Sequence, residues 1–284
     1  MFAVCPLSQV PVRVQSKDAS EMVSQVLFGE MVEVLEKRGK NWLKIRCTWD
    51  NLVGWCRSNQ LKILTPAERE IAQEDWARAL DLCQPVMGEN HHFPVPFGSV
   101  LPQYDGMRLK IGDEFFTFNG QALMKSDLRK DTEFLVKIAK RLLFAPELSG
   151  GRSPFGIDSA GLMQVIFGFV GKSLPRTAAE QVFTGEDVDF VEQSRVGDLA
   201  FFEDKKGIIA HVGLILGEGL LIHCNGMVKT DRFDHFGVFD GNSRRYAFKL
   251  RVIKRVFTFT EKDNTGNEIQ GDLNTEQEKL LSYH

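Results

Sequence analysis

The chain has 284 residues and a formal net charge of −3, from 35 basic and 38 acidic side chains. Its hydrophobic fraction of 43% is ordinary for a globular protein, and its length allows two or three domains. No excess of positive charge is available to hold a nucleic-acid backbone, so we expect no nucleic-acid partner. No apolar run approaches the roughly 20 residues of a membrane span, so we expect no membrane association.

The N-terminus, Met1 to Pro6, has no basic segment followed by an apolar stretch and does not look like a secretory signal. The five cysteines are scattered, without a CxxC pair: Cys5, Cys47, Cys56, Cys83 and Cys224. Such a set favours reduced thiols over disulfides or a zinc site. We therefore expect a cytoplasmic protein with no metal and no other cofactor.

Residues 1–63 predict a small β barrel. Val10–Val14 places three valines on one face, and Trp42–Cys47 alternates in the same way. Met31–Leu35 is rich in strand formers, and Val53–Cys56 completes the set. Short strands separated by polar turns are typical of small barrels.

Residues 64–83 predict a linker helix. Thr65 can cap it, with Pro66 at its first position and Glu68 completing a capping box. Apolar side chains then recur at helical spacing: Ala72, Trp76, Ala79, Leu80 and Cys83.

Residues 84–125 return to strands and turns and predict a second β module. Leu109–Ile111 and Phe115–Phe118 flank a Gly-Asp turn, and Asn119-Gly120 is a strong turn signal.

Residues 126–256 predict an α+β domain, because helical patterns come first and strand patterns follow. The expected helices are 131–143, 159–169 and 178–183, and the expected strands are 199–202, 211–216, 220–223 and 248–256. Residues 257–284 are polar with little periodicity and predict a tail.

A glycine-rich stretch from Gly150 to Gly161 leads into the helix expected to begin near Ser159. A nucleophile at a helix N-terminus lies at the positive end of the dipole, beside free backbone N–H groups that can hold an oxyanion. The same residues also have a purely structural interpretation, since Asp158 and Ser159 are favoured capping residues.

Two histidines, His211 and His223, lie in consecutive expected strands. If these strands pair through Gly217–Gly219, one imidazole can act as a base and the other can orient it. Two unrelated histidines on a half-buried sheet are the alternative. A zinc site would need a third ligand, and Cys224 would face away from His223.

Four stretches follow one another in the order and separation of a known motif series: Gly156–Leu162, Val196–Phe202, Ala210–Gly213 and Ile222–His223. They resemble the motifs of the NlpC/P60 papain-like peptidases. Phe28–Glu30 and Gly54–Trp55 resemble the turn and closing strand of bacterial SH3 domains. The resemblance implies an α+β fold of two small SH3-like β barrels followed by a papain-like NlpC/P60 domain. This is the architecture of the γ-D-glutamyl-L-diamino acid endopeptidases, which act on peptidoglycan stem peptides.

By this resemblance Ser159 occupies the nucleophile position, His211 is the base and His223 orients the base. Asp158 would pair with the free amine of a stem peptide. The remaining ligand-binding positions implied by the family are Glu147, Ala160, Arg176 and Ala178. Glu147 replaces an aromatic hydroxyl of the family and would change ligand preference, or it is an ordinary exposed loop glutamate.

The sequence departs from the family pattern at the nucleophile itself, where Ser159 replaces a cysteine and Ala160 replaces a serine. The preceding loop, 147–151, and the Leu174–Ala178 segment also differ from the family. A thiol with a pKa of about 8.5 ionises readily beside an imidazole, whereas a hydroxyl does not. A reacting oxygen misplaced by about 1 Å can cost on the order of 10²-fold in rate. We therefore expect little or no peptidase activity.

Several departures together favour a naturally degenerate site over a laboratory change at one position. The main hypothesis is a cytoplasmic protein of the murein-peptide class that binds a peptide or related ligand with impaired hydrolysis. The enzyme alternative is an active endopeptidase with a serine nucleophile or an engineered Cys-to-Ser site. The non-enzyme alternative is an interaction scaffold that acts through its SH3-like modules. The sequence leaves the oligomeric state open.

Overall fold

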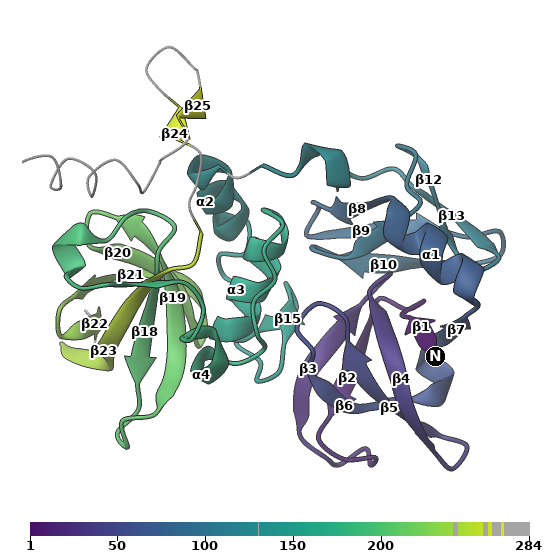
Figure 1. Ribbon diagram of the computed structural model, residues 1–284, viewed down its shortest axis with the longest axis horizontal. Coiled ribbons are helices and arrows are strands. Elements are labelled where there is room, and N and C mark those ends of the chain that lie inside the picture. Colours follow the sequence, from purple (N-terminus) through teal and green to yellow (C-terminus); the bar gives the residue numbers. More distant parts are fainter. Residues whose placement is uncertain (130, 241–243, 258–260, 263–267, 270–284) are drawn as a thin grey trace, which may run out of the picture.

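Figure 1 shows the computed structural model, in which two β modules lie beside one another and an α+β domain packs next to them. The structure describes residues 1–129, 131–240, 244–257, 261–262 and 268–269. Within these ranges, no helix has the length and apolar character needed to cross a bilayer. The tail expected at 257–284 lies almost entirely outside the described residues.

The first module is an antiparallel sheet in the order β3-β2-β6-β5-β4-β1-β7. Its strands are β1 (Phe2–Val4), β2 (Gln9–Arg13), β3 (Met22–Leu27), β4 (Met31–Arg38), β5 (Trp42–Cys47), β6 (Val53–Arg57) and β7 (Lys62–Leu64). Alternation along β2 buries Val10 and Val12 completely, as the pattern of valines predicts, but the expectation is wrong for Val14, which lies past the end of the strand and is 47% exposed. The expected strands are confirmed, while β1, β3 and β7 were not anticipated.

The linker helix is shorter than the sequence predicts. α1 (Pro66–Glu74) begins with the expected capping box, in which Thr65 and Glu68 bond each other's backbone N–H groups. The prediction that the helix continues to residue 83 is wrong, because Trp76–Ala79 forms strand β8. Ala77 and Ala79 are fully buried in the second module, so pairing and burial there outweigh the helical spacing.

The second module contains sheets in the orders β10-β9-β13-β12 and β11-β8-β14. Its remaining strands are β9 (Cys83–Met87), β10 (His92–Pro96), β11 (Val100–Pro102), β12 (Arg108–Ile111), β13 (Glu114–Phe118) and β14 (Ala122–Met124). Phe28 of the first module packs edge-on against Phe93 and Phe116, with ring centroids 5.7 and 6.0 Å away. The two modules therefore share a hydrophobic core.

The α+β domain contains a sheet in the order β17-β23-β18-β19-β20-β21-β22, and β22 also pairs with β23 to close a barrel. The strands are β17 (Glu186–Val188), β18 (Leu199–Glu203), β19 (Ile209–Gly217), β20 (Leu220–Asn225), β21 (Met227–Asp234), β22 (Gly237–Asp240) and β23 (Arg245–Arg255). The expected strands are confirmed, but β17, β21 and β22 were not anticipated. The remaining short elements of the whole chain are β15 (Arg152–Ser153), β16 (Gly156–Ile157), β24 (Glu261–Lys262), β25 (Glu268–Ile269), η1 (Ser58–Gln60), η2 (Lys125–Asp127) and η3 (Val191–Gln193).

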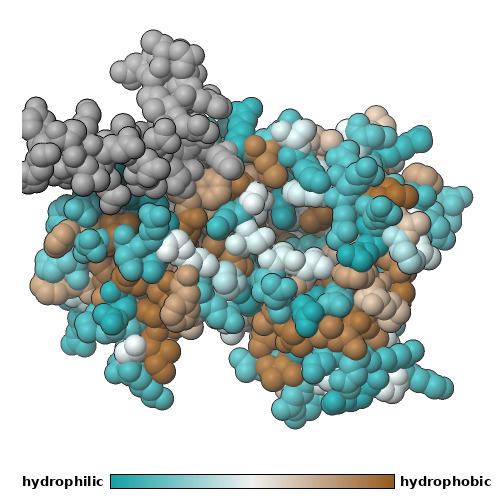
Figure 2. All heavy atoms as spheres, viewed as in Figure 1, coloured by the Kyte–Doolittle hydropathy of each residue, from teal (hydrophilic) through white to brown (hydrophobic). Residues whose placement is uncertain are grey.

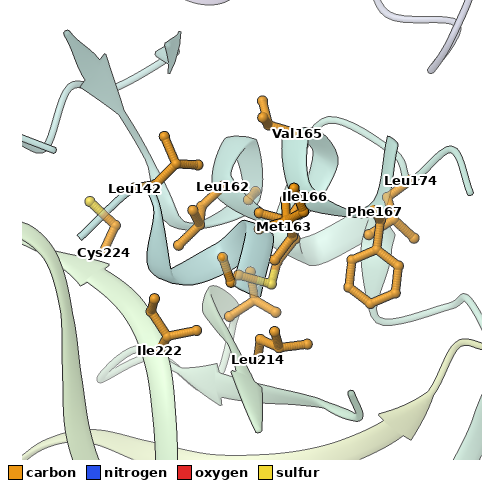
Figure 3. Packing of buried hydrophobic residues seen from close by; sticks show 14 of the residues in the cluster. Leu142, Leu162, Met163, Val165, Ile166, Phe167, Leu174, Leu214, Ile222 and Cys224 are labelled. Carbon is orange, nitrogen blue, oxygen red and sulfur yellow. The ribbon is translucent and has the colours of Figure 1, made fainter. Parts of the chain in front are cut away.

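The helices of this domain are α2 (Thr132–Lys140), α3 (Ser159–Gly168) and α4 (Ala178–Gln181), close to the predicted positions. α3 is apolar around most of its circumference and is buried from Ser159 to Phe167. Figure 3 shows Leu162 and Met163 of α3 facing Leu214 of β19 and Ile222 of β20. This packing fixes the start of α3 relative to the barrel.

The molecular surface differs between the modules. Figure 2 shows a mostly hydrophilic face over the second module. On the same face, apolar side chains gather over the strands of the first module and along β18 and β19 of the barrel.

A buried ion pair joins the first module to the α+β domain. Arg152 of β15 donates through Nη1 and Nη2 to the Glu30 carboxylate at 2.7 and 2.9 Å, and each side chain is only 4% exposed. Arg152 also donates to the backbone oxygen and side-chain oxygen of Gln25, at 2.7 and 2.8 Å. The charge and hydrogen bonds of Glu30 raise the pKa of Arg152 against the opposing effect of burial.

The neighbouring loop approaches the first module at Gly150. This residue has φ of 79°, and a Cβ there would lie 2.4 Å from the backbone oxygen of Met22. Glycine is therefore required by both the conformation and the close contact.

The buried pair gives a direct test. Glu30→Gln leaves the Arg152 guanidinium without its countercharge in a buried site, so we expect the free energy of unfolding to fall by about 3–5 kcal/mol. Urea denaturation measures the change. The control is Glu33→Gln, which removes the partner of Arg46 on the surface and should cost less than about 1 kcal/mol. Equal losses in the two variants would contradict the importance of the buried pair.

Candidate functional site

Ser159 is the first residue of α3, directly after the N-cap residue Asp158. Asp158 Oδ1 accepts a hydrogen bond from the backbone N–H of Gly161 at 2.7 Å, which fixes the helix start. Ser159 is 7% exposed, and its hydroxyl makes no hydrogen bond with any described residue. The local sequence thus builds a helix start of the kind that a nucleophile uses, and its first residue carries an alcohol that is unpartnered among the described residues.

The Asp158 carboxylate also accepts hydrogen bonds from groups outside the helix. Its Oδ2 accepts from the backbone N–H of Gly150 at 2.8 Å, and Arg176 donates to both carboxylate oxygens at 3.0 and 2.6 Å. The Arg176 side chain is 4% exposed, whereas that of Asp158 remains 23% exposed. The structure therefore brings these two predicted ligand-binding residues into contact with one another and leaves part of the carboxylate open.

Ala160 and Ala178 are buried members of the domain's main hydrophobic cluster. The backbone oxygen of Ala160 accepts from Gln181 Nε2 at 3.0 Å. The structure places both methyl groups in the packing between α3, α4 and the sheet.

Glu147 lies on the surface in the loop before α3. Its Oε2 accepts from the backbone N–H of Gly226 at 2.6 Å, and its own N–H donates to the Gly226 oxygen at 3.0 Å. Glu147 therefore ties this loop to the turn between β20 and β21.

His211 and His223 meet across the antiparallel β19–β20 hairpin, as the sequence predicts. His211 Nε2 lies 2.7 Å from His223 Nδ1. Gly213 pairs with His223 in the ladder, and a Cβ on Gly213 would lie 2.8 Å from Leu221 Cδ1 and 3.2 Å from His223 Cβ. Glycine at this position therefore allows the two strands to bring the rings together.

Asp231 of β21 is a third member of this site that the sequence analysis did not identify. Its Oδ2 lies 3.0 Å from His223 Nε2 and 2.9 Å from Lys229 Nζ. Strand β21 was not anticipated, so the partner strand of His223 was missing. This strand could have been predicted from the charged residues Lys229 and Asp231, which lie two positions apart, as on one face of a strand, just after the turn at Gly226.

The carboxylate of Asp231 determines the ring protons, assigned here from the hydrogen-bond network. Asp231 only accepts, so His223 carries hydrogen on Nε2 and accepts at Nδ1. His211 must then donate from Nε2, which leaves a lone pair on its Nδ1. This is the tautomer that a general base requires.

Burial makes the pair a weak base. Desolvation, followed by the neighbouring His223, lowers the pKa of His211 to about 3. Desolvation also lowers the pKa of His223, although Asp231 opposes that effect. Phe248 stacks on His211 with ring centroids 4.0 Å apart and planes inclined by 3°. A base with such a low pKa gives little help in removing a proton from an alcohol.

Cys224 points to the other side of β20 from His223, as the sequence predicts. Its thiol donates to the backbone oxygen of Ile157 at 3.2 Å, and Figure 3 shows it within the hydrophobic cluster. Burial raises the pKa of Cys224 to about 12. This thiol is therefore neither placed beside His223 nor ionised, so it is not suited to act as a nucleophile there. The described residues include no group of three or more His, Cys, Asp or Glu side chains suited to a metal ion.

The profile of the NlpC/P60 family matches residues 148–241, and that of the bacterial dipeptidyl-peptidase SH3 domain matches residues 12–61. A γ-D-glutamyl-L-lysine dipeptidyl-peptidase of Bacillus subtilis is 31% identical over 216 residues, covering 70% of this chain and 71% of that protein. The chain belongs to the NlpC/P60 family.

Further proteins are similar to this NlpC/P60 protein in sequence or in fold. A Bacillus cereus γ-D-glutamyl-L-lysine dipeptidyl-peptidase is 24% identical over 238 residues, covering 72% of this chain and 68% of that protein. The crystal structure of a Bacillus cereus NlpC/P60 family protein has a TM-score of 0.78 at 19% identity, covering 91% of this chain and 100% of that one. An NlpC/P60 endopeptidase from Photobacterium damselae subsp. piscicida has a TM-score of 0.66 at 15% identity, covering 88% of this chain and 70% of that one. These two structures support the fold, with SH3-like sheets before the NlpC/P60 domain.

The buried imidazole predicts a pH dependence of stability. The His211 pKa is about 3 in the folded protein and about 6.5 in the unfolded chain, so below pH 6.5 the unfolded state binds more protons. The free energy of unfolding should therefore fall as pH decreases, by up to about 1.4 kcal/mol per pH unit. Chemical denaturation between about pH 7 and pH 5 measures this slope. His211→Gln should flatten it, and an unchanged slope in that variant would contradict the prediction.

The role of Asp231 can be tested by ¹⁵N NMR of the imidazole nitrogens. In the unmodified protein we expect His211 to carry hydrogen on Nε2 only, whereas Asp231→Asn should give a mixture of tautomers, because an amide can donate or accept. Lys229→Met is the matched control, since it removes the other partner of Asp231 and keeps the carboxylate. The same tautomer distribution in all three proteins would show that Asp231 does not control the ring protons.

Proposed function

We propose that this NlpC/P60 protein binds a peptidoglycan-derived peptide of the γ-D-glutamyl-L-diamino acid class and does not hydrolyse it at an appreciable rate. The observation that carries the proposal is the start of α3. There, Ser159 replaces the family's cysteine and forms no hydrogen bond with the described residues. Burial lowers the pKa of both imidazoles, so the pair that would activate Ser159 is a weak base.

The ligand class is supported by the relatives and by one open carboxylate. Two dipeptidyl-peptidases that match 70% and 72% of this chain are named for γ-D-glutamyl-L-lysine. Asp158 keeps part of its carboxylate exposed beside the helix start, although Arg176 occupies both oxygens. A free amine on the peptide would bind this remaining exposed part.

The loss of hydrolysis follows from proton transfer. A cysteine nucleophile attacks as a thiolate, which forms when a nearby imidazole takes its proton. Ser159 would have to lose its proton during the attack itself, to a base whose pKa is about 3. The family arrangement of base and orienting residue is therefore present with a nucleophile that it cannot activate.

Calorimetry and a hydrolysis assay with L-Ala-γ-D-Glu-L-Lys test the proposal. We expect saturable binding and no product from the unmodified protein, the same result from Ser159→Ala, and weaker binding by Asp158→Asn. Chromatography of the reaction mixture measures cleavage. Rapid cleavage that disappears in Ser159→Ala would overturn the loss of hydrolysis, and absence of binding by the folded protein would overturn the ligand class.

A second candidate function is an endopeptidase that lacks only its thiol. The hydrogen-bonded chain from His211 through His223 to Asp231 favours it, because this chain gives His211 the tautomer of a base. Strong turnover by Ser159→Cys would support this candidate. We expect at most weak turnover, since the buried His211 ring is covered by Phe248 and disfavours the imidazolium that a thiolate needs.

A further inference from the structure

A pocket of about 280 Å³ lies between the first module, the end of α1 and strands β8 and β11 of the second module. Its walls include two indoles, Trp49 and Trp76, together with Arg78 and Glu30. None of its lining residues belongs to the Ser159, His211 and His223 site. Its volume is close to the lower end of the range for small-molecule sites.

Arg78 gives this pocket a positive charge that no carboxylate of the described residues neutralises in an ion pair. Its Nη1 donates to the backbone oxygen of Gly98 at 3.0 Å, and its Nε is buried without a hydrogen-bond partner. Within the described part of the chain, no carboxylate forms an ion pair with it. Glu30 is close by, but both of its oxygens accept from Arg152 and one also accepts from the backbone N–H of Leu27.

The two indoles supply flat apolar surface to the same pocket as this polar group. The Arg78 guanidinium lies 5.3 Å from the centre of the Trp76 ring, while Arg152 lies 4.4 Å from that of Trp49. The Trp49 Nε1 is a second buried donor without a partner. A flat ring that lies against an indole gains apolar contact and favourable aromatic geometry.

A neighbouring cavity shares Glu30, Trp49 and Arg78 with this pocket. Its volume of about 20 Å³ is that of a water site and excludes an organic molecule. An organic ligand therefore belongs in the larger pocket.

We propose that the larger pocket is a binding site for a small organic monocarboxylate that carries a flat apolar ring. The carboxylate binds the Arg78 guanidinium, for which it is the complementary planar acceptor. The ring lies against Trp49 and Trp76. Glu30 borders the same pocket, so a dianionic group such as a phosphate meets more repulsion than a single carboxylate does.

Isothermal calorimetry with the full chain tests this site, with phenylacetate as the probe. We expect saturable binding with a Kd of about 1 mM or below, as is usual for a ligand of this size. Phenylacetamide has nearly the same shape without the charge and should bind at least about tenfold more weakly. Phenyl phosphate should also bind more weakly than phenylacetate. Equal binding of the acid and the amide, or no binding by the folded protein, would overturn the proposal.

Variants locate the binding to this pocket. Arg78→Met and Trp76→Leu should each weaken phenylacetate binding at least about fivefold, whereas Arg78→Lys should keep part of it. Arg38→Met is the matched control, because Arg38 lies 4.3 Å over the Trp55 ring and does not line the pocket. Ser159→Ala should bind phenylacetate normally, which separates this site from the proposed peptide site. A loss in Arg38→Met as large as that in Arg78→Met would contradict the assignment.

Discussion

The ion pair between Arg152 and Glu30 holds together the parts of the protein on which the candidate site depends. Arg152 pairs in β15 with Ile157 of β16, directly before Asp158 and Ser159. Because Glu30 belongs to the first module, the pair fixes that module against the loop that leads into α3. Removing one partner of a buried ion pair leaves the other charge buried and unpaired, which is costly. The pair therefore constrains how the first module lies against the NlpC/P60 domain.

We propose that this NlpC/P60 chain retains the scaffold of a hydrolytic site while its reacting group has changed. The helix start, the capping carboxylate and the hydrogen-bonded imidazoles are all present. In the proposed function, the alcohol of Ser159 is the changed group, because it does not ionise as a thiol does and the buried His211 is a weak base. Binding and turnover are thus separated in physical terms: a carboxylate such as Asp158 can attract an amine without any nucleophile.

The modules before the NlpC/P60 domain contribute more than a spacer. Phe28 joins the cores of the two β modules, and Glu30, two residues later, joins the first module to the NlpC/P60 domain. The pocket beside Arg78 is formed by residues from both modules and from α1, so it exists only in the assembled chain. It is chemically distinct from the site at Ser159, since it offers the Arg78 cation, while the carboxylate of Glu30 is paired with Arg152, and its walls include two indoles.

The sequence by itself determined the features that depend on near neighbours. The capping box of Thr65 and Glu68, the start of α3 at Asp158 and the hairpin that unites His211 and His223 all follow from short-range patterns. Only the tertiary structure decided that Trp76–Ala79 is a strand, that Asp158 binds Arg176 and that Asp231 completes the imidazole chain. These outcomes depend on partners distant in sequence or on strands without a clear pattern, because pairing and burial in the folded protein select among conformations that local propensity leaves close in energy.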